Sequence, residues 1–200
     1  MKIIYLASKS PRRKELLRQI GVPFELLPLR EFPLDRRDVD ESPLPNENPV
    51  DYVQRIARIK AEAACRIMQS RRLPQRLVLA ADTTVTLDGE IFAKPVDAAD
   101  AVRMLQRFSG KVHQVLTAVA VSDGREMKEI LSTSDVTFRT LTDAEIRAYV
   151  ATGEPLDKAG AYGLQGKAAV FVSHLSGSFS SVIGLPLAET WSLLREFDPS

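Results

Sequence analysis

The chain has 200 residues, of which 44% are hydrophobic, enough to bury the core of one domain. Its formal net charge of +1 gives no overall electrostatic reason to expect a nucleic acid or a membrane as partner, and we predict neither. The single cysteine, Cys65, excludes an intrachain disulfide and a cysteine-based zinc cluster.

The first part of the chain predicts short strands alternating with helices. Its apolar run at residues 3–7 is too short for a signal peptide or a membrane span, so we expect a cytoplasmic protein. The predicted elements are a buried strand at 2–6, a helix at 11–20 closed by Gly21, a strand at 24–27, a proline-rich loop from about 30 to 48, and a long helix from Asn48-Pro49 to near residue 70.

The second part adds hairpins. We predict strands at 77–81 and 85–87, a turn at Asp88-Gly89, a helix at 97–108, long strands at 112–121 and 126–138 joined at Asp123-Gly124, a helix from the capping box of Thr142 and Glu145 to about 152, a strand at 170–173 and a helix at 187–197. Because adjacent hairpins cannot all belong to a parallel sheet, the predicted fold is α/β with a mixed sheet flanked by helices.

Residues 6–17, LASKSPRRKELL, place two arginines on the first turn of a helix that follows a strand. Ser10 is a favourable N-cap and Pro11 suits the first helical position. Arg12 and Arg13 then lie beside unpaired backbone N–H groups, and the hydroxyls of Ser8 and Ser10 can add to a phosphate site. The alternative is a well-capped helix with exposed arginines.

Two carboxylates are candidates for chemistry. Asp82 follows the apolar run LVLAA, where we expect the strand to emerge toward a loop, and could hold Mg²⁺ or orient a water for attack on phosphorus. The alternative is that Asp82 only caps a turn. Glu41, in DVDES, could supply a second oxygen ligand, or could belong to a merely solvated acidic loop.

Basic and histidine residues give weaker local signals. Lys94 precedes Pro95, which restricts the backbone and could fix where the ammonium group points. Lys60 has the pattern of a solvated helix face. His113 and His174 lack a third partner at metal-ligand spacing, so we predict a structural role for His113 and no zinc site.

Residues 157–166, DKAGAYGLQG, let the backbone approach a ligand closely but do not form a Walker loop, and a tight strand connection is the alternative.

Seven segments resemble the Maf family of nucleoside triphosphate pyrophosphatases, in family order over nearly the whole chain. These are LASKSPRRKELL, DVDES with Arg55 and Lys60, AADT at 80–83, AKP at 93–95, SGKVHQVLTAVAV at 109–121, EPLDKAGAYGLQG at 154–166 and GSFSSVIGLPLAET at 177–190. The resemblance implies one domain over residues 1–200 whose two lobes share an extended sheet around a central cleft, as in ITPase-like folds, often as a homodimer.

The resemblance also implies roles for individual residues. Asp82 corresponds to the proton acceptor, and Glu41 with Asp82 to the ligands of Mg²⁺ or Mn²⁺. Base preference falls on Arg12, Thr83 and Gln165, and phosphate binding on Ser8, Ser10, Arg13, Lys60 and Lys94. Asp157 and Lys158 could line the same pocket. The chain departs from many relatives at residues 167–169 and at Ser181, which could alter the substrate range.

The function implied is hydrolysis of the α–β phosphate bond of a nucleoside triphosphate to the monophosphate and pyrophosphate. DKAGAYGLQG resembles the subgroup acting on dTTP and UTP, and modified pyrimidine nucleotides are further candidates. The alternative is a nucleotide-binding regulator of cell division that does not turn its ligand over. A pure binding module would not need Asp82, which favours the enzyme.

Overall fold

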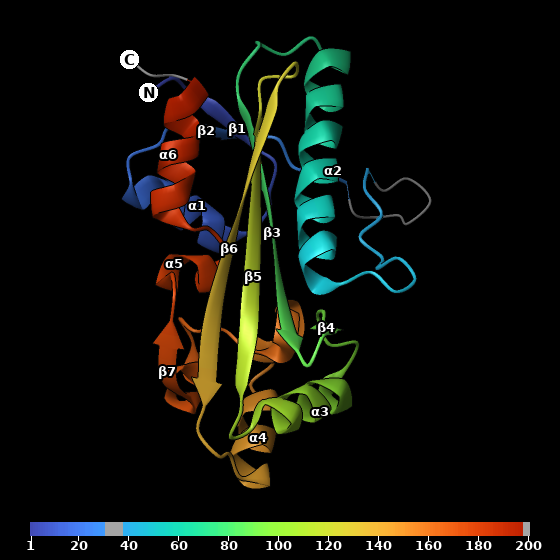
Figure 1. Ribbon diagram of the computed structural model, residues 1–200, viewed down its shortest axis with the longest axis vertical. Coiled ribbons are helices and arrows are strands. Elements are labelled where there is room, and N and C mark those ends of the chain that lie inside the picture. The colour runs from blue at the N-terminus through green and yellow to red at the C-terminus, as the bar shows by residue number, and fades with distance from the viewer. Residues whose placement is uncertain (31–37, 198–200) are drawn as a thin grey trace. The chain divides into compact units, whose positions relative to one another are not determined.

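A mixed seven-stranded sheet organises the chain in the computed structural model, which describes residues 1–30 and 38–197 (Figure 1). The hydrogen-bonded order is β2-β1-β3-β5-β6-β7, with β4 paired to β3. Strand β1 is parallel to β2 and β3, whereas β4 is antiparallel to β3 and β7 is antiparallel to β6. The strands are β1 Ile4–Leu6, β2 Phe24–Leu26, β3 Val78–Leu87, β4 Glu90–Phe92, β5 Val112–Ser122, β6 Met127–Phe138 and β7 Val172–Ser176. The predicted mixed α/β sheet is therefore confirmed.

The helices begin where the sequence supplies side-chain caps. Ser10, Asn48, Asp97 and Thr142 each accept a hydrogen bond from a first-turn N–H, and Thr142 with Glu145 forms the predicted capping box. The α-helices are α1 Pro11–Gln19, α2 Pro49–Ser70, α3 Ala98–Phe108, α4 Asp143–Val150, α5 Phe179–Ile183 and α6 Leu187–Phe197; the 3-10 helices are η2 Glu154–Asp157, η3 Ala159–Ala161 and η4 Lys167–Phe171. Within the described ranges, no helix combines the length and apolar character that a membrane span requires.

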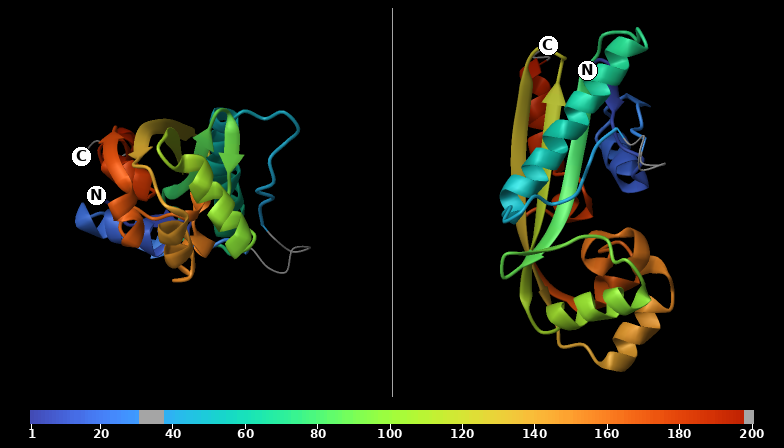
Figure 2. Two further views of the ribbon diagram at one scale, coloured as in Figure 1. Left: turned by 90° about the horizontal axis from the view of Figure 1, so that it is seen from below. Right: turned by 90° about the vertical axis from the view of Figure 1, so that its right-hand side faces the viewer.

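The chain divides into two compact units, and the division falls inside β3, β5 and β6. The first unit contains the described residues of Met1–Asp82, Thr117–Leu131 and Gly184–Ser200. In this unit α2 covers one face of the sheet and α6 the other (Figures 1 and 2). The buried side chains of Leu6, Ile56 and Leu79 illustrate its core, which the apolar face of α2 supplies in part.

The second unit contains Thr83–Leu116 and Ser132–Ile183. Its core is aromatic, with Phe108 at the centre, 4.7 Å from Phe92 and 6.1 Å from Phe138 between ring centroids. His113 lies in this core, 1% exposed, stacked on Phe108 with ring centroids 4.4 Å apart. The arrangement of two lobes around a cleft stays a prediction.

Three details of the sequence prediction differ from the structure. The separate strands at 77–81 and 85–87 are one strand, β3, because the β-branched Thr83 and Thr84 continue the extended backbone. Residues 170 and 171 belong to η4, whose Ala168 and Phe171 are buried, so β7 begins only at Val172. Strand β4 and helix α5 were not predicted, since three and five residues are too short for periodicity to reveal. Part of the predicted loop, 31–37, lies outside the described residues.

Gly160 provides a test of the packing in the second unit. Its φ is +68°, and a Cβ there would lie 2.8 Å from the Cγ2 of Val85, a buried residue of β3. We expect Gly160→Ala to lower the free energy of unfolding by about 2 kcal/mol or more, because it combines left-handed strain with overpacking. Gly153→Ala is the matched control, since φ is +75° and no atom lies within 4 Å of a Cβ. If urea titrations gave the same loss of unfolding free energy for both variants, the close packing of Gly160 against Val85 would be contradicted.

Candidate active site

Asp82 lies inside β3 and not at its end. The predicted emergence toward a loop is therefore wrong, although the carboxylate itself is placed for chemistry. Its side chain is 12% exposed, and the strand continues through it because Lys60 of α2 neutralises its charge. Thr83 follows directly in β3, so its side chain points to the opposite face of the strand.

Lys60 joins the two predicted carboxylates. Its Nζ donates to Oδ1 of Asp82 at 2.8 Å and to Oε2 of Glu41 at 2.9 Å. The Lys60 side chain is 13% exposed and that of Glu41 is 47% exposed, so the alternative of a solvated helix face is wrong for Lys60. Burial alone would lower the pKa of Lys60, but the charges of Asp82 and Glu41 raise it above its ordinary value. Lys60 therefore stays an ammonium group at neutral pH.

The connection from β1 to α1 carries the predicted anion site. Oγ of the N-cap Ser10 accepts from the N–H of Arg13 at 3.4 Å, and Oγ of Ser8 accepts from the N–H of Ser10 at 3.2 Å. Arg12 is half-buried on the same turn. The predicted cap is thus confirmed, and the hydroxyls of Ser8 and Ser10 lie at the start of α1, where an anion can bind.

Arg13 is held in place and is not a freely exposed arginine. Its Nε donates to the carbonyl oxygen of Gly184 at 2.8 Å and its Nη1 to Oγ of Ser8 at 3.4 Å. Burial lowers the pKa of Arg13, and the nearby charges of Asp82 and Glu41 act in the opposite direction. Arg13 therefore shares an electrostatic environment with the two carboxylates, which favours the predicted anion site over exposed helix arginines.

The remaining predicted residues belong to the second unit, as Thr83 does. Lys94 is exposed on the segment between β4 and α3, followed by the buried Pro95. Gln165 is exposed in the turn before η4. The structure thus brings Ser8, Ser10, Arg13, Glu41, Lys60 and Asp82 together in the first unit, while a site that also includes Thr83, Lys94 and Gln165 stays a prediction.

Two helix residues hold the acidic segment on α2: Tyr52, which the sequence interpretation missed, and Arg55, to which it gave no role. Oη of Tyr52 donates to the carbonyl oxygen of Glu41 at 3.1 Å, and Nη2 of Arg55 donates to that of Ser42 at 3.0 Å. Arg55 also pairs with Glu47 at 2.5 Å. Burial and the charges of Asp82 and Glu41 raise the pKa of Tyr52, so it remains a hydrogen-bond donor. Since Tyr52 and Lys60 are two turns apart on α2, the helical spacing could have revealed the shared face.

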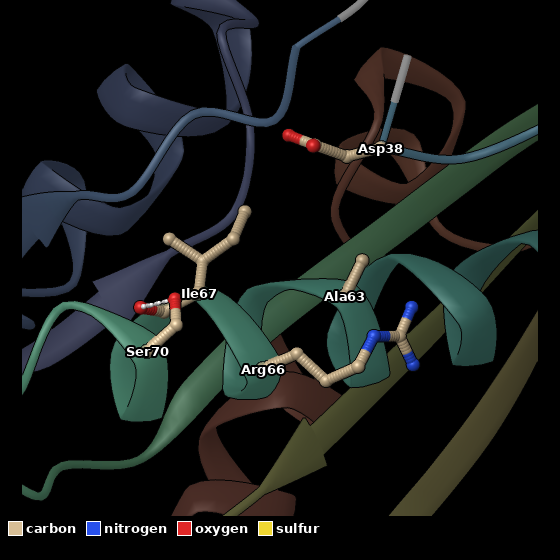
Figure 3. Close-up of a pocket in the computed structure, with 5 residues that line it drawn as sticks. All are labelled: Asp38, Ala63, Arg66, Ile67 and Ser70. Atoms are coloured by element: carbon tan, nitrogen blue, oxygen red, sulfur yellow. Dashed lines mark hydrogen bonds between the residues drawn. The ribbon is translucent and has the colours of Figure 1, made fainter. Parts of the chain in front are cut away.

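The other acids of DVDES have different partners. Asp38 pairs with Arg30 at 3.0 Å, and Asp40 accepts from the N–H of Ser42 at 2.9 Å. Asp38 lies across a hollow of about 210 Å³ from Ala63 and Ile67 of α2 (Figure 3). Glu41 is therefore the acid of this segment that joins Asp82 around Lys60.

The pair of carboxylates fits one kind of metal site. Oxygens of Glu41 and Asp82 converge on the single cation Lys60, so the same pair can face a divalent cation. In the described part of the chain, no three His, Cys, Asp or Glu residues gather into a metal site, so a cage built of protein ligands alone does not fit. Mg²⁺ and similar hard cations need only one or two carboxylates when water and substrate phosphates complete the shell.

Comparisons with known proteins place the chain in a family. The family model described as "Maf-like protein" matches residues 3–197. A "dTTP/UTP pyrophosphatase" of Aromatoleum aromaticum is 57% identical over 97% of this chain and 95% of its own, and one of Dechloromonas aromatica is 54% identical over 96% of both chains. A structural comparison matches the Staphylococcus aureus Ham1 protein with a TM-score of 0.47 at 19% identity, covering 68% of this chain and 72% of that one.

Proposed function

The chain belongs to the Maf family, and from that premise we propose that it is a nucleoside triphosphate pyrophosphatase that requires a divalent cation. It cleaves the α–β phosphate bond and releases a nucleoside monophosphate and pyrophosphate. The arrangement that carries this proposal is Lys60 between Asp82 and Glu41, with the charge of Arg13 nearby. A carboxylate at residue 82 can help to hold a cation, which nucleotide binding also uses, and it can accept a proton from water, which only turnover needs.

In the proposed mechanism, Asp82 accepts a proton from the water that attacks phosphorus, and the bond to the pyrophosphate leaving group breaks. Lys60 holds the Asp82 carboxylate in place and contributes positive charge toward the phosphates. Arg13, fixed by Gly184 and Ser8, presents its guanidinium to phosphate oxygens, with Ser8, Ser10 and Lys94 as further donors. Glu41 and Asp82 would hold Mg²⁺ or Mn²⁺, which would neutralise phosphate charge and make a water more acidic.

We propose dTTP and UTP as substrates, because the relatives matched over nearly the whole chain carry those names. Arg12, Thr83 and Gln165 select the base, with the Gln165 amide able to donate to and accept from a pyrimidine edge.

From the family alone, we also propose that the protein is cytoplasmic and forms a homodimer, and that each chain is a single domain with two lobes. Sedimentation at several protein concentrations tests the dimer.

The test is an assay of products. Purified protein is incubated with a panel of nucleoside triphosphates and Mg²⁺, Mn²⁺ or EDTA, and the products are separated by ion-exchange chromatography. We expect UTP and dTTP to give the monophosphate and pyrophosphate, and EDTA to abolish the reaction. Release of orthophosphate would reject the proposed bond. Tight binding without turnover would favour the regulator of cell division.

A further inference from the structure

The turn that carries Gln165 has a glycine at each end. The N–H of Gly166 donates to the carbonyl oxygen of Gly163 at 3.0 Å, and the N–H of Ala169 donates to that of Gly166 at 3.1 Å. The Gln165 side chain extends from this turn into solvent. Its position is therefore set by whatever fixes the two glycines.

Glu154, the first residue of η2, fills the space beside Gly166. A Cβ on Gly166 would lie 1.9 Å from Oε1 and 2.5 Å from Cδ of Glu154, so the carboxylate occupies the place of a side chain there. Its Oε2 also accepts from the N–H of Lys167 at 3.2 Å. The carboxylate therefore holds the C-terminal end of the turn by both packing and a hydrogen bond.

Lys158, just after η2, fills the space beside Gly163, at the N-terminal end of the turn. A Cβ on Gly163 would lie 2.7 Å from Cε of Lys158. The Nζ of Lys158 donates to the carbonyl oxygen of Glu154 and to Oδ1 of Asp157, both at 2.6 Å, and the side chain is 15% exposed. Lys158 therefore supports Gly163 and ties it to the backbone that presents Glu154.

The support is anchored in the aromatic core of the second unit. Oη of Tyr149 donates to Oε1 of Glu154 at 3.0 Å. Tyr149 is buried on α4 and meets Phe171, the last residue of η4, edge to face with ring centroids 5.2 Å apart. Burial and the charge of Glu154 raise the pKa of Tyr149, so the hydroxyl keeps its proton. The Glu154 carboxylate thus accepts a hydrogen bond from Tyr149 in the core through Oε1, and it holds the turn at Lys167 through Oε2.

We propose that Glu154 and Lys158 are positioning residues for base selection, acting through Gln165 without contact with the substrate. The proposal rests on the proposed function of Gln165. A glutamine amide both donates and accepts, so by rotating it can match either uracil or cytosine, which present opposite donors and acceptors at positions 3 and 4. Discrimination between them requires the amide to approach the base from a fixed position, and the two supports beneath Gly163 and Gly166 fix the backbone from which the Gln165 side chain extends.

The experiment compares the ratio of kcat/KM for UTP to that for CTP in four proteins: the wild type, Glu154→Ala, Gln165→Ala and the double variant. We expect Glu154→Ala to lower the ratio by about tenfold or more, through a higher KM for UTP and not through kcat. In the Gln165→Ala background, Glu154→Ala should leave the ratio unchanged. Glu90→Ala is the matched control, because it removes a carboxylate of the second unit whose ion pairs are with Arg103 and Arg107 of α3.

Each result has a distinct reading. A Glu154→Ala protein that loses thermal stability but keeps the wild-type ratio of kcat/KM values would overturn the proposal. The proposal would also be overturned if Glu154→Ala lowered this ratio equally in the wild-type and the Gln165→Ala backgrounds. Glu154→Gln replaces the alanine variant if that does not fold, and should shift the ratio in the same direction, since a neutral amide makes weaker hydrogen bonds to Tyr149 and Lys167 than the carboxylate does. If the wild type releases no pyrophosphate, the proposed function fails, and the relative affinities of UTP and CTP by calorimetry decide the positioning role instead.

Discussion

Replacing Asp82 by asparagine is expected to slow pyrophosphate release from UTP by about 10²–10⁴-fold, the usual contribution of a positioned general base. The asparagine has nearly the same shape and keeps an oxygen that can accept from Lys60, so the cluster with Glu41 retains its hydrogen bonds. What is lost is the ability to take a proton from water. The measurement is the steady-state rate at saturating UTP and Mg²⁺, together with nucleotide affinity by calorimetry.

The control for this substitution is Asp88→Asn, the same change in the turn between β3 and β4. Asp88 has φ +55°, which asparagine also tolerates, and it is exposed. We expect its rate to match the wild type. A rate for Asp82→Asn within a factor of about ten of the wild type, in a folded protein, would remove Asp82 from the role of proton acceptor.

The parts of the fold that were predictable from the sequence are those fixed by local hydrogen bonds. Ser10, Asn48 and Thr142 were identifiable as caps because the N–H groups they bond lie three residues away. The turns at Gly89 and Gly124 were identifiable because their φ angles, +79° and +91°, favour glycine.

Asp82 shows why the rest was not predictable. A polar residue after an apolar run usually marks the end of a buried strand, and nothing nearby in the sequence indicates that a lysine 22 residues earlier compensates its charge. The role of Lys60 was not predictable for the same reason: its partner Asp82 is distant in the sequence, and its neighbours on α2 are typical of a solvated helix face. The resemblance of whole segments to a family assigned a role to each of the two residues but did not indicate that they pair, and helical periodicity describes one element and not what it meets.

The Glu154 support was beyond sequence reasoning for a related cause. DKAGAYGLQG was interpreted through its glycines, which indicate close backbone approach without indicating what approaches. In the structure the approaching groups are the protein's own, Glu154 at Gly166 and Lys158 at Gly163. The ammonium group of Lys158 donates to Asp157 and to the Glu154 backbone, and its predicted place in the lining of a ligand pocket stays a prediction.

The stability of the second unit is expected to fall as the pH drops below about 6.5, because of His113. Burial lowers the pKa of His113 from 6.5 to about 4. Its Nε2 shares a 2.8 Å hydrogen bond with Oη of Tyr162, and within the described structure its buried Nδ1 has no partner. A neutral ring tolerates a bare Nδ1, whereas protonation would place an N–H there with no acceptor.

The direction of this pH dependence follows from whether the folded or the unfolded chain binds a proton at His113 more tightly. The unfolded chain takes up a proton near pH 6.5 and the folded chain only near pH 4, so the stabilisation is complete above pH 6.5 and is lost as the pH falls toward 4. At about 1.4 kcal/mol per pH unit, the whole interval is worth about 3 kcal/mol and the part between pH 7 and 5 about 2 kcal/mol.

Urea titrations at pH 7 and pH 5 provide the measurement, with His113→Gln and His174→Gln as a matched pair, since the chain has only these two histidines and His174 is exposed. We expect His113→Gln to lose most of the pH dependence and His174→Gln to retain it. Comparing pH 7 with pH 5 also separates this effect from that of Glu145. Arg139 lowers the pKa of Glu145 from its ordinary value of 4.5 to about 2. The stabilisation that Glu145 contributes is therefore lost mainly as the pH falls below 4.5, outside the compared interval. Equal slopes in the two variants would place the acid sensitivity outside the aromatic core.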